Sequence, residues 1–476
     1  MNGLMFVSLL AATGLAQAQS ATAPAAPVDE SLTWHGITLY GIVDVGFQNQ
    51  THGAPISDYF PGGSADIVQK DSNHSVTGVT PSNLSQSRIG LQGAEPIVGD
   101  WSGVFKLETF FNPQSGDISD ALKSLAQNNG RSVANQNTNL DSSVAGQTFQ
   151  QSFAGFSSKT FGTITFGRQN SVLADGIAKY DPNFASQAFS LIGLSGTTAG
   201  GGDTQNRRFD SSLKYVGSYG VADSGMAHLA ALYKFNQSTG SANTAFEVAI
   251  GGEFAGLSVD AYYAKIKDAV SVAALSAEQV ADLPGLCPNP LPTGGSCVAA
   301  SPGTALAATI SDNTSYAILG LYNWADVVKF YAGYEHIQYA NPDAPLSAGF
   351  TVAAYTIAYV NTQSGSKSTY VNDKTLEVYW GGVRYTVIPN LDLVVAYYGY
   401  KQNAYGTGSN AGCSTNKSGT CSGNLDDLSF DADYRLTKRF DVYAGVMYTG
   451  VRNGLASGYD FNTTDITTTT GVRFKF

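Results

Sequence analysis

Charged residues are scarce in this sequence, because Asp, Glu, Lys and Arg together make up 13% of it, against roughly 25% in soluble globular proteins. A long apolar run is also missing: beyond the first residues, no stretch approaches the roughly 18 apolar residues that a spanning helix needs. A helical membrane protein is therefore disfavoured, while the low charge still favours an environment other than water. The net charge of -11 argues against nucleic acid as a partner.

Cysteine is also scarce, with 4 residues that fall into two local pairs. Cys287 and Cys297 flank "PNPLPTGGS", and Cys413 and Cys421 flank "STNKSGT". Because neither pair has a His or another Cys at zinc-finger spacing, we predict two short disulfide-closed loops rather than a metal site. Disulfides indicate an oxidising compartment. We expect no metal and no cofactor.

The first residues carry an export signal. "MNGLMFVSLLAATGLAQAQS" contains an apolar run followed by Ala16-Gln17-Ala18, the small-x-small pattern of signal-peptide cleavage. We predict a signal peptide over 1–18 and an Ala/Pro-rich extension over 19–35. One domain then covers 36–476.

Segments of about ten residues with alternating apolar and polar side chains recur through that domain, a length that lets a tilted strand cross a bilayer. We expect sixteen such strands, at 37–49, 85–95, 101–112, 148–158, 161–170, 208–218, 225–236, 244–254, 257–267, 314–324, 327–338, 375–386, 391–402, 425–436, 439–450 and 467–476.

The connections between these strands alternate in length. Those after the even-numbered strands are short, for example "AG" and "VIPN", whereas those after the odd-numbered strands are mostly long. Short turns at one end and long loops at the other are typical of an up-and-down outer-membrane barrel with periplasmic turns and external loops. Both Cys pairs fall in long loops.

The side-chain alternation distinguishes a membrane barrel from a soluble β-sandwich. "FEVAIGGEF" places Phe246, Val248, Ile250 and Phe254 on one face and Glu247 on the other. A dry core does not accept unpaired charges cheaply, so the charged faces belong to water and the apolar faces to lipid. The phase of 314–324 and of 375–386 is ambiguous. Sixteen strands also leave an aqueous channel in the middle of a barrel.

Several segments carry a family likeness. They are "GITLYGIVDVGF" (36–47), "SQSRIGLQGAEPI" (85–97), "FKLETFFNPQSG" (105–116), "FAGFSSKTFGTITFGRQ" (153–169), "FDSSLKYVGS" (209–218), "ADYRLTKRFDVYAGVMY" (432–448) and the terminal Phe476. Together these segments resemble the Gram-negative trimeric porins of the β-proteobacterial type. The resemblance implies an all-β fold: a 16-stranded antiparallel transmembrane β-barrel, assembled as a homotrimer in outer-membrane lipid and lipopolysaccharide.

The resemblance further implies that the third long loop, roughly 171–207, folds inward and narrows the channel. Its acidic residues would then face basic side chains on the wall, and the resulting field would sort solutes. The acidic candidates are Asp175, Asp181 and Asp203; the basic candidates are Arg88, Lys106, Lys214, Arg207 and Arg208. Each of these residues is also open to a simpler interpretation as a solvated charge.

Two further residues take roles from the same resemblance. Arg168 shares a face with Ile164 and Phe166, where a lone Arg in lipid is costly, so we expect it at a subunit interface. A snorkelling Arg at headgroup level is the alternative. Phe476 resembles the terminal signal read by the outer-membrane assembly machinery, and its strand should close the barrel near Tyr40 and Val43.

The sequence thus predicts a porin that passes small hydrophilic solutes and ions by passive diffusion. A substrate-specific channel and a barrel serving mainly as surface adhesin or receptor are the alternatives. We expect no enzymatic activity, because the chain has no G-x-S-x-G, no H-E-x-x-H and no P-loop motif.

Overall fold

A computed structural model describes residues 32–52, 74–119, 148–192, 207–221, 225–235, 243–271, 307–341, 343 and 372–476. The predicted signal peptide, most of the extension, Asp203, Cys287 and Cys297 lie outside these residues. The strands are β1 (Thr33–Trp34), β2 (Ile37–Gln50), β3 (Val76–Pro81), β4 (Arg88–Val98), β5 (Trp101–Phe110), β6 (Gln151–Ser158), β7 (Gly162–Asn170), β8 (Arg208–Val221), β9 (Gly225–Lys234), β10 (Ala245–Phe254), β11 (Leu257–Ser271), β12 (Ala307–Trp324), β13 (Val328–Ala340), β14 (Lys374–Ile388), β15 (Leu391–Gln402), β16 (Gly423–Arg435), β17 (Phe440–Asn453) and β18 (Thr464–Lys475).

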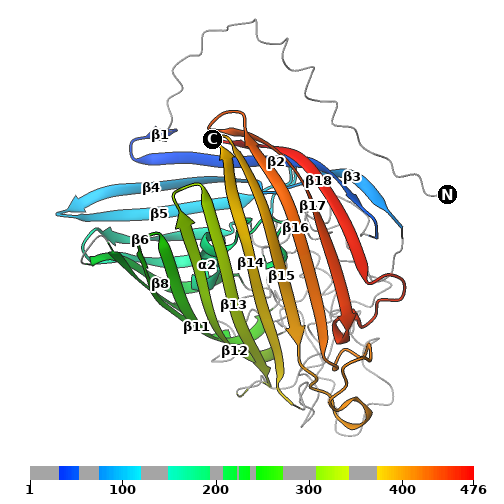
Figure 1. Ribbon diagram of the computed structural model, residues 1–476. Coiled ribbons are helices and arrows are strands. Elements are labelled where there is room, and N and C mark those ends of the chain that lie inside the picture. The colour runs from blue at the N-terminus through cyan, green and yellow to red at the C-terminus, as the bar shows by residue number, and fades with distance from the viewer. Residues whose placement is uncertain are drawn as a thin grey trace, which may run out of the picture.

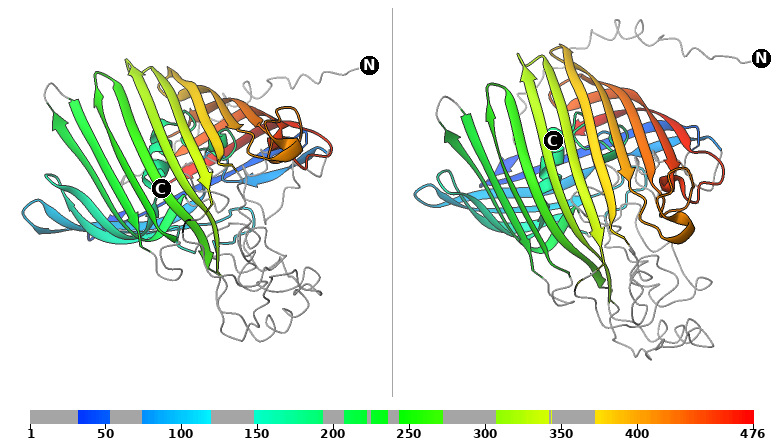
Figure 2. Two further views of the ribbon diagram at one scale, coloured as in Figure 1. Left: turned by 90° about the horizontal axis from the view of Figure 1, so that it is seen from below. Right: turned by 60° about the horizontal axis from the view of Figure 1, so that its bottom comes forward.

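These strands form one antiparallel sheet that closes on itself, and Figures 1 and 2 show the tilted ring that results. The last strand, β18, pairs with β2, with Phe474 opposite Val43. Beyond it, the backbones of Phe476 and Gly41 exchange two hydrogen bonds of 2.9 and 3.1 Å. The predicted closure of the barrel is confirmed, and among the described strands it leaves no unpaired edge facing lipid.

Eighteen strand segments make sixteen positions around the barrel. One half of β2 pairs with β3 and the other half pairs with β4, so β3 and β4 share one position. They are separated by Ser82, whose φ of +61° breaks the extended chain. The two-residue β1 pairs with β2. The sixteen-stranded prediction is therefore confirmed, although the sequence did not reveal the break in the second strand.

The two rims of the barrel differ, as expected. At one rim the strands are joined by tight turns, such as Ala255 (φ +49°) and Gly256 (φ +83°) between β10 and β11. Two residues at positive φ form the turn that matches the twist of paired strands. The chain ends at this rim (Figure 1). Within the described residues the chain also forms the α-helix α2 (Val172–Tyr180) and two short 3-10 helices, η9 (Gly408–Asn410) and η10 (Gly454–Ala456).

None of the helices in the described part of the chain is long and apolar enough to cross a membrane.

Exposure is inverted relative to a soluble protein. Ile250 and Phe430 on the outer surface are 67% and 45% exposed, whereas Glu247 and Asp431, on the opposite faces of the same strands, are each 1% exposed. Charged side chains thus point into the barrel and apolar ones point out, as the alternation predicted. The outer surface suits hydrocarbon and the inner surface suits water.

The two strands of ambiguous phase have apolar residues on both faces. Ile318 on β12 is 55% exposed on the outside, while Leu319 is 1% exposed on the inside. On β14, Val378 and Trp380 are buried inside, at 0% and 4%. The interior is apolar here because the third loop packs against it. This packing explains why the alternation alone did not fix the phase.

Candidate channel constriction

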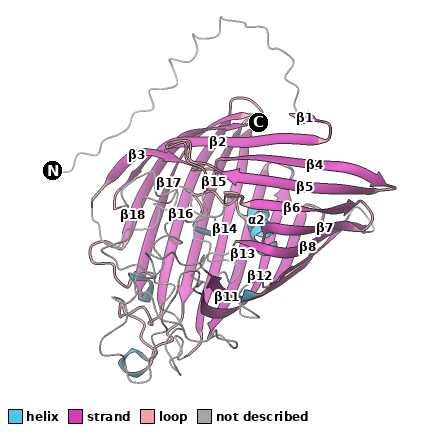
Figure 3. Cartoon of the chain, turned by 180° about the vertical axis from the view of Figure 1, so that it is seen from behind, coloured by secondary structure: helices cyan, strands magenta, loops and turns pink. Residues whose placement is uncertain are grey.

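The third loop enters the barrel as a short helix, α2 (Figure 3). Ser171 caps the helix, because its hydroxyl accepts a hydrogen bond of 3.0 Å from the Ala174 N–H. The Glu247 carboxylate of β10 accepts another, of 2.5 Å, from the Val172 N–H. The helix ends at Asp181, whose N–H donates to the Ile177 carbonyl. Two otherwise unpaired N–H groups at the helix start are thereby satisfied.

Loop and wall share a hydrophobic core inside the lumen. Ile177 and Tyr180 of the helix are 0% exposed and belong to one buried cluster with Leu319, Val378 and Trp380 of the strands. Polar bonds reinforce this packing. Trp380 Nε1 donates to the Tyr180 carbonyl at 3.0 Å, and Arg384 donates to the Pro182 carbonyl at 2.8 and 3.1 Å.

Beyond the helix, the loop reaches the break between β3 and β4. The carbonyl of Asn83 accepts hydrogen bonds from the backbone N–H groups of Gln187 and Ala188, at 2.9 and 3.0 Å. The Ser186 hydroxyl donates to the same carbonyl at 2.9 Å. The described part of the loop, 171–192, is therefore anchored at the helix start and at the break, and it crosses the lumen.

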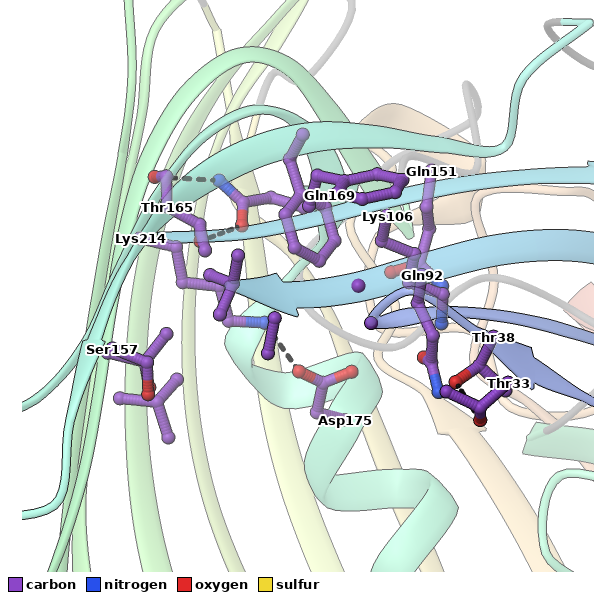
Figure 4. A pocket seen from close by; sticks show the side chains of 18 residues that line it. Thr33, Thr38, Gln92, Lys106, Gln151, Ser157, Thr165, Gln169, Asp175 and Lys214 are labelled. Carbon is purple, nitrogen blue, oxygen red and sulfur yellow. Dashed lines mark hydrogen bonds and ion pairs between the residues drawn. The ribbon is translucent and has the colours of Figure 1, made fainter. Parts of the chain in front are cut away.

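The acidic candidates have different surroundings. Asp175 pairs with Lys214 on β8, and its side chain is 50% exposed (Figure 4). Asp181 is 0% exposed and accepts from the Tyr398 hydroxyl at 2.6 Å and from the N–H groups of Asn183 and Ala185. Asp181 is thus buried inside the loop, with the charge of Arg207 acting on it, and its place at the constriction stays a prediction. Its carboxylate fixes the backbone of the loop, and burial raises its pKa.

Among the basic candidates, Arg88 and Lys106 lie on either side of one carboxylate, Glu108. Arg88 Nε is 3.8 Å and Lys106 Nζ is 3.5 Å from Glu108 Oε2, which also accepts a hydrogen bond of 2.9 Å from Tyr40. The sequence analysis missed Glu108, although it has the same parity as Lys106. The barrel wall therefore supplies a negative charge of its own beside its cations, in addition to the acidic residues of the loop.

Arg207 and Arg208 lie where the loop returns to the wall. The Arg207 carbonyl accepts from the Ser171 N–H at 2.9 Å, so the return strand meets the start of the loop. Burial lowers the pKa of the Arg207 guanidinium. The Arg208 guanidinium lies over the Phe110 ring, 4.8 Å from its centroid. The structure thus gathers all five predicted cations on or beside strands β4, β5 and β8.

Two cavities follow this side of the lumen. The larger, of about 640 Å³, is lined by Lys106, Lys214 and several neutral polar side chains (Figure 4). The second, of about 420 Å³, is lined by Lys179, His228, Glu253 and Asp260. Asp175, Lys214 and Val216 line both. The Asp175–Lys214 pair consequently stands where the two cavities meet.

Arg168 follows a bulge in β7. The register with β8 shifts between Gly167 and Gln169, and Gly167 has a φ of +135°. Thr165 and Gln169 are bonded to each other and buried, while Phe166 is 52% exposed on the outside. Arg168 lies on the opposite, outer face from Thr165 and Gln169. Within the described residues, its buried Nε has no hydrogen-bond partner.

One predicted disulfide lies within the described residues. Cys413 and Cys421 are bonded, with Cα atoms 5.1 Å apart, and they close a loop of the long-loop rim between β15 and β16. This pairing is confirmed. In the part of the chain that the structure describes, no group of three or more His, Cys, Asp or Glu residues could hold a metal ion.

Comparisons with known proteins agree with this architecture. A family model for Gram-negative porins matches residues 6–454. An outer membrane porin protein of Bordetella pertussis is 27% identical over 158 residues, which are 33% of this chain and 34% of that protein. The match thus spans about a third of that relative's length.

Solved structures share the fold at low identity. An anion-selective porin from Comamonas acidovorans gives a TM-score of 0.57 at 15% identity, over 92% of this chain and 99% of that one. OmpT, an outer membrane protein of Vibrio cholerae, gives 0.51 at 15% identity, over 94% and 100%.

A closed barrel with an apolar outside, a charged inside and a loop across its lumen defines a porin-type membrane protein. With the family model matching nearly the whole sequence, this chain belongs to the Gram-negative porin family. Its location is the outer membrane.

Proposed function

We propose that this porin forms a water-filled channel through which small hydrophilic solutes and ions diffuse passively. The inward-facing charges of a sixteen-position barrel support this proposal most directly, since their exclusion from lipid requires a hydrated lumen. Adding the purified protein to a planar lipid bilayer tests it. Stepwise increases in current are expected, and a protein that inserts without raising the current would contradict the proposal.

We further propose that the constriction lies between the loop and the wall formed by β4, β5 and β8. There five cations, Arg88, Lys106, Arg207, Arg208 and Lys214, outnumber the four carboxylates beside them, Asp175, Asp181, Glu108 and Glu247. This excess of positive charge supports a preference for anions. The reversal potential under a salt gradient measures it, and a potential of the sign that cation flow produces would contradict it.

A homotrimer is the proposed assembly, with Arg168 at the subunit interface. The position of Arg168 on the outer face, opposite to the buried pair Thr165 and Gln169, supports a contact with a neighbouring subunit. Arg168→Ala should lower the temperature at which the trimer band disappears on unboiled gels, whereas Arg168→Lys should lower it less. Unchanged trimer melting in Arg168→Ala would favour a snorkelling side chain instead.

We propose that the protein is a channel rather than an enzyme. We also propose that the barrel assembly machinery recognises Phe476.

Two alternative functions would give different results in current measurements. A substrate-specific channel would show saturable block of the current by its substrate. An adhesin or receptor built on a plugged barrel would raise no current. Deletion of Phe476 should slow assembly of the barrel in cells, with the folded form on unboiled gels as the readout.

A further inference from the structure

A short segment of the barrel wall, residues 82–87, leaves the sheet between β3 and β4. On β2, only Val43 and Asp44 separate the last partner of β3 from the first partner of β4. Six residues thus stand where an unbroken strand would need two, so the surplus chain bulges out of the sheet. Asn83 of this segment is 0% exposed and contacts the third loop, which places the bulge on the lumen side. We call residues 82–87 the wall insert.

One carboxylate, that of Asp44, organises the wall insert. Asp44 is 0% exposed, and its Oδ2 accepts hydrogen bonds from the N–H groups of Leu84 and Ser85, at 2.9 and 2.8 Å. The Asp44 carbonyl accepts from the Ser82 N–H at 2.7 Å and from the Ser87 hydroxyl at 3.1 Å. An irregular segment cannot satisfy its N–H groups through a strand ladder, so this buried aspartate replaces the ladder.

The neighbouring strands complete this support. The Tyr443 hydroxyl of β17 donates to Asp44 Oδ1 and accepts from Asn83 Nδ2 at 3.1 Å. Arg473 of β18 is the register partner of Asp44, and its guanidinium donates to the Ser85 hydroxyl at 2.8 Å. The positive charge of Arg473 also acts on the Asp44 carboxylate. The buried carboxylate therefore has both the donors and the counter-charge that it requires.

The wall insert in turn holds the tip of the third loop, residues 186–189. The Asn83 carbonyl accepts hydrogen bonds from three donors of this tip, and Gln187 Nε2 donates to Gln86 Oε1 at 2.5 Å. A small buried apolar cluster joins the insert, the tip and the wall, and it consists of Leu84, Ala188, Phe189 and Tyr443. It shares no residue with the larger cluster that surrounds α2. The loop thus has two separate attachments, one at its helix and one at the wall insert.

We propose that Asp44 is a positioning residue of the constriction: it shapes the wall insert, and the insert fixes the loop tip and thereby sets the width of the channel. A buried N–H that loses its acceptor carries the full cost of desolvation. Without the Asp44 carboxylate the insert therefore cannot keep its shape, whereas α2 keeps its own apolar contacts. The effect on permeation rests on the channel proposed above, but the attachment of the loop tip does not.

Hydrogen exchange of the detergent-purified protein, followed by mass spectrometry, tests the attachment. In Asp44→Ala, peptides containing Gln187 and Ala188 should exchange about tenfold faster than in the wild type, because their N–H groups lose the Asn83 carbonyl. Peptides from α2 should exchange at the wild-type rate. Tyr443→Phe removes one hydroxyl and keeps the ring in the apolar cluster, so it should give the same pattern with a smaller increase.

Entry of uncharged sugars into liposomes tests the effect on the channel. The rate for a trisaccharide relative to a monosaccharide should rise about twofold or more in Asp44→Ala, since a released tip leaves a wider opening. Asp465→Ala is the matched control. Asp465 of β18 is 1% exposed and accepts from the His52 N–H at 2.7 Å, just beyond the end of β2. This control should change neither the exchange at the loop tip nor the ratio of the sugars.

Three outcomes would overturn the proposal. They are unchanged exchange at the loop tip in both variants, an equal increase in α2, and the same changes in Asp465→Ala. Faster exchange at the tip with a constant ratio of the sugars would show that Asp44 holds the tip without setting the channel width. If Asp44→Ala does not fold, Tyr443→Phe decides both measurements. A wild type that admits no sugar would refute the channel alone, because the exchange pattern still reports the attachment.

Discussion

The two sides of the lumen differ in what covers them. The side formed by β12 to β15 presents Leu319, Val378, Trp380 and Tyr398 to the loop and packs like the core of a soluble protein. We call it the loop-packing wall. The side formed by β4 to β8 presents polar and cationic side chains to open cavities, and we call it the open wall. One barrel interior thus serves two purposes: the first wall holds the loop, and the second meets the solute.

This difference implies that stability and selectivity are separable. Substitutions in the loop-packing wall should loosen the loop without altering the charges that a solute meets. Substitutions in the open wall should alter those charges and leave the packing intact. The following predictions test that separation.

Trp380→Ala should have the largest effect. Trp380 is 4% exposed and donates to the Tyr180 carbonyl, so its truncation removes both packing and a hydrogen bond. Loss of a buried Trp typically costs about 3–5 kcal/mol. We expect a lower midpoint of thermal unfolding by circular dichroism in detergent, together with a larger, noisier single-channel current as the loop detaches.

Trp324→Ala is the matched control for that experiment, because Trp324 is 59% exposed on the outer face of β12. It should leave the current of the channel unchanged. If the current through Trp380→Ala is as small and as free of noise as that of the wild type, the loop-packing wall does not hold the loop.

Asp181→Asn should have an intermediate effect, confined to stability. The neutral amide keeps the shape of the side chain, but it weakens the bonds from Tyr398 and from two backbone N–H groups. A weakened buried hydrogen-bond set costs about 1–3 kcal/mol. The thermal midpoint should fall while the reversal potential stays constant. A shifted reversal potential would place Asp181 in the solute pathway.

The strands could be predicted from the sequence because each one carries its own signal. Residues 244–254 were expected as a strand, and β10 spans Ala245–Phe254. Lipid on one side and water on the other impose the alternation strand by strand, whatever the rest of the fold does. The short β3 was missed, because it has six residues and a break follows it at Ser82.

The site was harder to predict, because its geometry depends on contacts between distant residues. Asp181 is acidic and lies in the third loop, but its burial depends on Tyr398, far away in the sequence. Sequence pattern gives no sign of that contact. Glu108, in contrast, could have been found, because it lies two residues after Lys106 and therefore shares the inner face of the same strand.

Asp175→Asn should have the smallest effect on stability and a distinct effect on selectivity. Asp175 is half exposed, and the buried Lys214 ammonium keeps a hydrogen bond of 3.0 Å to the Asn170 carbonyl, so the loss of the pair should cost about 1 kcal/mol. The Lys214 ammonium then lacks its ion-pair partner where the two cavities meet. We expect the anion-to-cation permeability ratio to rise by about twofold or more, since a fixed charge in a narrow channel acts on every passing ion.

A second Asp–Lys pair supplies the control for this prediction. Asp343 lies 2.6 Å from Lys267 near the long-loop end of β11, and its side chain is 60% exposed. Asp343→Asn removes the same charge from the protein without changing the junction of the cavities, so the reversal potential should match that of the wild type. If both variants shift it equally, the net charge of the protein sets selectivity. If only Asp175→Asn shifts the reversal potential, the charges at the open wall set selectivity, and the loop contributes to them through the Asp175 carboxylate.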